Sequence, residues 1–142
     1  MEDLFESLTR GNVAEVKIVL ASVVAALAIY QLALIAVGYG KLRPPFLAAR
    51  PAALSHRAIG DGIVVLAFLV GLMCLSVYGF DDEGGIHAIA GVAVLAALAV
   101  KVGVVRWGGR RLGRVLPVIG LTVFALLMLT WATSAGDFLA DR

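Results

Sequence analysis

Two histidines stand at the start of long apolar runs, and each is followed four residues later by a glycine. The first pair is His56 with Gly60, and the second is His87 with Gly91. On a helix, the glycine lies one turn from the histidine on the same face, and its missing side chain leaves room for a flat ring system near the backbone. These His-x-x-x-Gly motifs therefore suggest haem binding. The alternative is that histidine tolerates the lipid headgroup layer while glycine permits close helix packing.

Methionine is the candidate for a second axial ligand, because His/Met ligation of haem is known and raises its potential. Met73 and Met128 each lie seven residues before the end of an apolar run, which places them about 10 Å below one membrane surface. His87 belongs to that surface, whereas His56 belongs to the opposite one, about 30 Å away. We therefore expect a haem at His87, with Met73 as ligand and Met128 as its substitute. Simple packing is the alternative for both methionines, and His56 would form hydrogen bonds or carry protons.

Two charged residues and one amide also lie in the apolar runs. Asp61 and Lys101 are each about one turn inside the same membrane surface, on neighbouring antiparallel segments. We expect them to form an ion pair, either as a clamp between helices or as part of a site that handles protons or a quinone headgroup. Gln31 lies in the middle of the first run, where an interhelical hydrogen bond is expected.

The composition indicates that these residues lie in a membrane protein. Of 142 residues, 61% are hydrophobic and 15% are charged, against roughly 25% charged residues in soluble domains. The mean hydropathy is +0.99, so the excess of apolar surface must face lipid. A net charge of +2 without a concentrated basic face argues against nucleic-acid binding. Cys74 is the single cysteine, which excludes an internal disulfide and a cluster of thiolate ligands.

Stretches long enough to cross the hydrocarbon layer define the expected elements. Continuous apolarity predicts helices rather than barrel strands, and short connections favour an up-down arrangement. Prolines predict that the first connection, Gly40–Arg57, is not helical. We therefore predict an all-α fold, an integral membrane four-helix bundle that forms a single domain over residues 1–142. The expected spans are Val16–Tyr39, Ala58–Phe80, Ile86–Val105 and Val115–Ala135.

The distribution of charge orients this bundle. The first and third connections carry basic residues and no acidic ones, namely Lys41, Arg43, Arg50, Arg57, Arg106, Arg110, Arg111 and Arg114. Basic loops face the cytoplasm, so both termini are expected outside. The outer face would collect the acidic residues Glu2, Asp3, Glu6, Glu15, Asp81, Asp82, Glu83, Asp137 and Asp141.

Short motifs in the last 90 or so residues extend the pattern of the two histidines. They are His56-Arg57-x-x-Gly60, Cys74-Leu75 followed by Tyr78-Gly79-Phe80, His87 with Gly91, Lys101, Leu116-Pro117 with Gly120, and Trp131-Ala-Thr-Ser-Ala135. With these motifs the chain resembles a family of small bacterial four-span membrane proteins of unknown function that are similar to membrane b-type cytochromes and ferric reductase-like transmembrane proteins. The family pattern commonly has a further histidine before the Cys-Leu pair. Met73 stands there in this chain, which either changes the ligand or signals that no haem is bound.

The resemblance implies an electron-carrying membrane subunit, and the expected function follows from it. We expect a redox subunit of a respiratory complex in the bacterial cytoplasmic membrane, rather than a stand-alone enzyme, with haem b near the outer face. Its expected partners are membrane lipid, other membrane redox subunits and a basic soluble electron carrier at the acidic outer face. A homodimer would bring two copies of His87 to the same depth. The competing hypothesis is a cofactor-free subunit that anchors a larger membrane complex.

Overall fold

The computed structural model describes residue 7 and residues 12–45, 47–78 and 85–140. Within these ranges the chain forms four long helices: α2 (Val13–Gly38), α3 (Ala49–Tyr78), α4 (Gly85–Trp107) and α6 (Leu116–Ala140). Each contains a segment that is long and apolar enough to cross a membrane. The structure therefore confirms an all-helical protein with four candidate membrane spans.

Helix α3 begins earlier than the sequence predicts. It starts at Ala49 rather than Ala58, so the second half of the predicted loop Gly40–Arg57 is helical. Pro51 lies in the first turn, where the missing N–H has no intrahelical acceptor and the fixed φ angle suits a helix. Ala52, which is fully buried, packs with Leu34 and Val37 of α2 and fastens this early turn to the bundle. As a result, His56 lies about two turns inside α3 instead of opening it.

The connections between α2 and α3 and between α4 and α6 are compact. Gly40 has a φ angle of +68°, a conformation that glycine adopts without strain, and the N–H of Lys41 donates to the carbonyl of Ala36 at 2.8 Å. The connection between α4 and α6 is also structured. It contains the short helix α5 (Gly109–Leu112) and the 3-10 turn η2 (Gly113–Val115).

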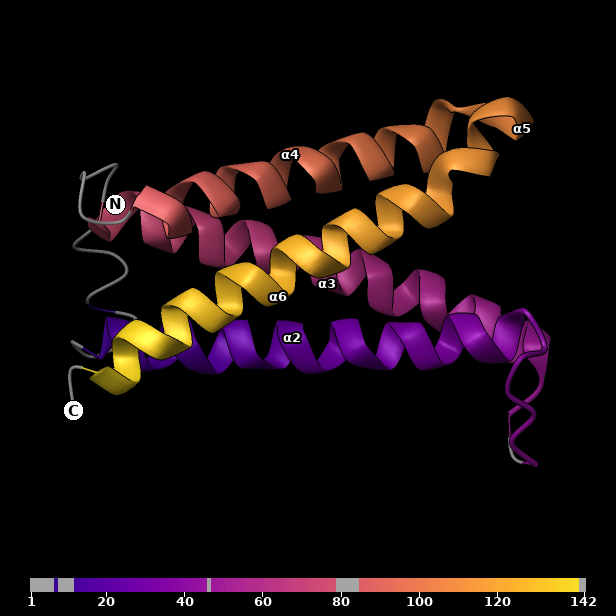
Figure 1. The fold of residues 1–142 in the computed structure, drawn as a ribbon, viewed down its shortest axis with the longest axis horizontal. Helices are drawn as coiled ribbons and strands as arrows, with labels where there is room; N and C mark the ends of the chain where they lie inside the picture. Colours follow the sequence, from indigo (N-terminus) through magenta and orange to yellow (C-terminus); the bar gives the residue numbers. More distant parts are fainter. Residues whose placement is uncertain (1–6, 8–11, 46, 79–84, 141–142) are drawn as a thin grey trace.

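The helices form two antiparallel hairpins. The most extensive contacts join α2 to α3 and α4 to α6, and the hairpins meet mainly through α2 and α6. Figure 1 shows α6 crossing the bundle from the end of α4 to the start of α2, while α3 runs from the end of α2 towards α4. The indole Nε1 of Trp131 donates to Ser22 Oγ at 3.0 Å and fastens α6 to α2.

A single core cluster joins all of these helices. Each contributes two buried residues spaced four apart, which places both on the same helix face. The cluster consists of Val24, Ala28, Ile63, Ala67, Val94, Leu98, Val123 and Leu127. Many other large apolar side chains of the helices are exposed, as expected for surfaces that face lipid.

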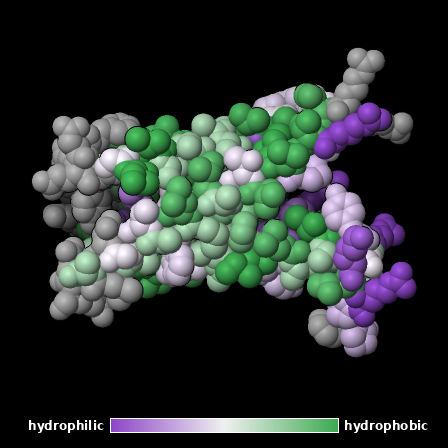
Figure 2. Space-filling model, viewed as in Figure 1, coloured by the Kyte–Doolittle hydropathy of each residue, from purple (hydrophilic) through white to green (hydrophobic). Residues whose placement is uncertain are grey.

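Basic side chains gather at one end of the bundle. This "basic end" is formed by the end of α2, the start of α3 and the α4–α6 connection, and it appears as the hydrophilic side of the molecule in Figure 2. Its exposed members are Lys41, Arg43, Arg50, Arg57, Arg106 and Arg114. The opposite, "terminal end" is where α2 begins and α6 ends. Several acidic residues predicted there lie outside the described residues: Glu2, Asp3, Glu6, Asp81, Asp82, Glu83 and Asp141.

Candidate functional site

His87 lies in the first turn of α4, at the terminal end, and its ring is held by α6. Its Nδ1 atom is 3.0 Å from Thr133 Oγ1. The Thr133 hydroxyl also donates to the carbonyl oxygens of Leu129 and Thr130, at 3.0 and 3.1 Å. Because a hydroxyl has one proton and two lone pairs, a Thr133 hydroxyl that donates to its own helix accepts from a protonated Nδ1 of His87. This contact fixes the orientation of the imidazole.

The terminal end also contains an open glycine face and a second hydroxyl. A Cβ atom placed on Gly91, one turn along α4, would meet no atom of the described residues within 4 Å. Ser134, next to Thr133, is 7% exposed, and its Oγ has no hydrogen-bond partner among the described residues. The terminal end therefore combines an oriented imidazole, an open glycine face and a buried hydroxyl available to a further group.

The two candidate methionines occupy different positions. Met73 is 3% exposed, on the terminal half of α3. Met128 is half-buried against the core cluster. Because α6 continues to Ala140 rather than ending at Ala135, Met128 lies at the middle of its helix, about 18 Å from the end instead of the predicted 10 Å. It is also about 7.5 Å deeper along α6 than Thr133. Met73 is therefore the better placed of the two for the terminal end.

A side chain from α2 packs beside His56. Gln31 Nε2 donates to the backbone carbonyl of His56 at 2.9 Å, which confirms the predicted interhelical hydrogen bond. The same Nε2 atom lies 3.7 Å from the Cβ position of Gly60. A Cβ atom on Gly60 would therefore be in ordinary van der Waals contact with Gln31, which lies on the side where the motif suggests space for a ring system.

Asp61 and Lys101, which the sequence predicts as an ion pair, have different surroundings. Asp61 is exposed and Lys101 is half-buried, and the two form no ion pair in the described part of the chain. Asp61 precedes the buried Ile63 by two positions, which puts it about 200° around the helix, on the side away from the core. Lys101 instead lies within electrostatic range of His56.

Two polar atoms on α2 and α3 are buried and lack hydrogen-bond partners among the described residues. They are Gln31 Oε1 and His56 Nδ1. Together with Lys101 they form what we term the Gln31–His56–Lys101 cluster, which lies towards the basic end. The mid-helix position of Gln31 predicts its hydrogen bond, but nothing in the sequence indicates that its oxygen has no donor among the described residues.

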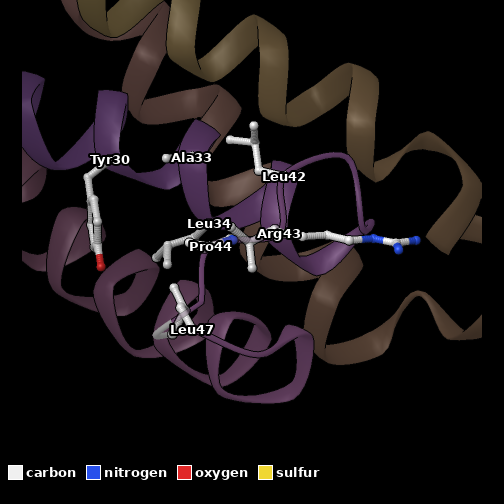
Figure 3. Close-up of a pocket in the computed structure, with 8 residues that line it drawn as sticks. Tyr30, Ala33, Leu34, Leu42, Arg43, Pro44 and Leu47 are labelled. Atoms are coloured by element: carbon white, nitrogen blue, oxygen red, sulfur yellow. The ribbon is translucent and has the colours of Figure 1, made fainter.

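A separate pocket of about 440 Å³ lies beside the second half of α2. Its walls are mainly apolar, and Figure 3 shows the guanidinium of Arg43 extending away from the other labelled side chains. The pocket is lined by Tyr30, Ala33, Leu34, Val37, Leu42, Arg43, Pro44 and Leu47. It contains neither histidine, so it does not belong to either motif.

Comparison with known proteins assigns the family but no activity. A family of unknown function, DUF6529, matches residues 4–142. The chain belongs to this family. No curated protein and no solved structure matches the chain. The DUF6529 match covers both histidine motifs, yet none of these comparisons shows a similarity to cytochromes, so haem binding stays a prediction.

Ligand chemistry narrows what a DUF6529 protein of this sequence could hold. The described residues form no group of three or more His, Cys, Asp and Glu side chains that could hold a metal ion. A haem iron needs only one or two protein ligands, because the porphyrin supplies the remaining nitrogens. A single well-oriented histidine such as His87 therefore matches haem better than it matches a site built from protein ligands alone.

Proposed function

We propose that this DUF6529 protein is a membrane electron-transfer subunit that holds haem b at the terminal end, with His87 as an axial ligand. The hydrogen bond between His87 Nδ1 and Thr133 carries the proposal. A bonded Nδ1–H selects the tautomer whose Nε2 lone pair coordinates iron, and a partner of this kind orients the imidazole and raises its basicity.

The other residues at this end fit the group. Gly91 leaves an open face for the edge of a macrocycle, and Ser134 offers a buried hydroxyl. Met73 is our candidate for the second ligand, with Met128 or His87 of a second copy as substitutes. Bound haem would supply the one-electron chemistry. The chain itself would orient His87, surround the site with apolar helices and exclude water.

The charge pattern supports an orientation for this transfer. We propose that the basic end faces the cytoplasm of a bacterial cell, by the positive-inside rule, with both termini outside. The haem would then lie near the outer face. Electrons would pass between a donor in the membrane and an external acceptor, such as another redox subunit or a basic soluble carrier docked by complementary charge.

The absorbance spectrum of the detergent-purified protein tests the proposal. We expect sharp α and Soret bands after reduction with dithionite and, by pyridine haemochrome, about one haem per chain. A featureless spectrum after expression with ample haem would overturn the proposal. That result would favour the cofactor-free anchor subunit, which should instead co-purify with other membrane subunits.

A further inference from the structure

We propose that the Gln31–His56–Lys101 cluster binds the hydroxyl-bearing ring of a lipid-soluble quinol. The proposal concerns binding alone and does not depend on haem at the terminal end. It starts from two buried atoms without hydrogen-bond partners among the described residues, Gln31 Oε1 and His56 Nδ1, and from the half-buried cation Lys101. They come from three different helices, α2, α3 and α4.

The first observation is the unsatisfied amide oxygen. Gln31 is 8% exposed, and its Nε2 atom is committed to the carbonyl of His56. This hydrogen bond fixes the side chain and leaves Oε1 buried without a donor. A buried acceptor of this kind is unfavourable unless a donor reaches it. The ring Nδ1 atom of His56 is also buried and also lacks a hydrogen-bond partner among the described residues.

The second observation is the cation. Lys101 is half-buried in a span, within electrostatic range of His56 and without an ion pair to Asp61. An ammonium group only donates hydrogen bonds, so it needs an oxygen acceptor. A ligand that satisfies the cluster therefore donates a hydrogen bond to Gln31 Oε1 or His56 Nδ1 and accepts one from Lys101.

A hydroxyl group meets both demands, because it carries one proton and two lone pairs. The phosphodiester of a phospholipid offers only acceptors and would leave Gln31 Oε1 unsatisfied. An aromatic hydroxyl fits better than an aliphatic one, because it is the stronger acid. It therefore donates more strongly to an imidazole or amide, and its oxygen tolerates negative charge beside an ammonium group.

The position of the cluster favours a ligand that arrives from the bilayer. Gln31 lies seven residues before the end of α2 at Gly38, or about 10 Å along the helix. Helices α3 and α4 meet towards the terminal end, where a Cβ atom on Gly71 would lie 2.9 Å from Leu95, and they diverge towards the basic end (Figure 1). Figure 2 shows the basic end hollowed between an upper and a lower part, with hydrophilic atoms inside the hollow.

Binding of decylubiquinol to the haem-free protein in detergent tests the proposal. The quinol is kept reduced under anaerobic conditions, and its binding is compared by equilibrium dialysis with that of its dimethyl ether and of 1-decanol. We expect saturable binding of one quinol per chain, with both comparison compounds about tenfold weaker or more, since each lacks the aromatic hydroxyl. Equal binding of the ether or the alcohol, or no saturable binding of the quinol, would overturn the proposal.

Variants then assign the binding to the cluster. Gln31→Leu and Lys101→Met should each weaken quinol binding about tenfold. Arg106→Met is the matched control, because it removes one positive charge from the exposed end of the same helix as Lys101 and should leave binding unchanged. Equal losses in all three variants would overturn the assignment. If a cluster variant fails to fold, the comparison of quinol with ether in the unaltered protein still decides. Because no haem is present in this assay, its result is separate from the spectrum that tests electron transfer.

Discussion

The two His-x-x-x-Gly motifs have the same spacing and opposite surroundings. At the first, Gln31 from α2 lies against Gly60 and bonds to the backbone of His56, whose ring Nδ1 has no partner among the described residues. At the second, the ring of His87 is held by Thr133 and the face of Gly91 is open. Helical spacing decides which residues share a face. The neighbouring helix decides whether that face is filled, so one motif is a packing contact and the other is a candidate ligand site.

The largest expected effect separates the two histidines. His87→Ala should abolish the haem absorbance, because it removes the proposed axial ligand, while His56→Ala should retain it. The measurement is the dithionite-reduced spectrum of each purified variant, normalised to protein. Full retention of the bands in His87→Ala, or their loss in His56→Ala alone, would reverse the comparison.

Substitutions of the two methionines test which of them belongs to the site at the terminal end. Met73→Ala removes a side chain that is 3% exposed, and the resulting cavity should lower the free energy of unfolding by about 2–5 kcal/mol. Met128→Ala should cost less, because Met128 is half-buried. If Met73 is the second ligand, its replacement should also lower the haem potential. The test combines unfolding in mixed micelles with a redox titration, and an unchanged potential in Met73→Ala would remove this residue from the site.

Substitutions of Gly60 and Gly91 test whether the helix face beside each glycine is packed or open. Gly60→Leu forces a side chain into the space of Gln31 and should destabilise the protein by about 1–3 kcal/mol through overpacking. Gly91→Leu should leave the unfolding free energy nearly unchanged, because it extends into open space, but should reduce haem content. Equal destabilisation by the two substitutions would contradict the difference between the motifs.

The smallest expected effects concern the two interhelical hydrogen bonds. Thr133→Val removes the partner of His87 Nδ1 and should cost about 0.6 kcal/mol, the average for such bonds in membranes. Gln31→Leu loses a similar bond but also removes the unsatisfied Oε1 atom, so its net effect on unfolding should be close to zero or stabilising. The measurement is thermal unfolding of both variants in the same detergent. A larger loss of stability in Gln31→Leu than in Thr133→Val would contradict this expectation.

The sequence predicts the spans well, because twenty or so continuous apolar residues allow little other than a membrane helix. It misses the start of α3, since Pro51 looks like a helix breaker until its place in the first turn is known. It also places Asp61 and Lys101 at similar depths, but depth alone does not say which way a side chain faces. Gln31 shows the same limit, because its hydrogen bond was predictable from a polar residue in an apolar run and its unpaired oxygen was not.

The pairing of α2 with α3 and of α4 with α6 bears on how the protein is made. Each hairpin brings its own basic connection, so each can insert into a membrane as a unit that keeps this connection on one side. Most contacts form within a hairpin, between segments that leave the ribosome one after the other. The joint between the hairpins runs mainly through α2 and α6, so it can form once both hairpins are in the membrane. A chain divided between α3 and α4 should therefore reassemble from two separately inserted halves.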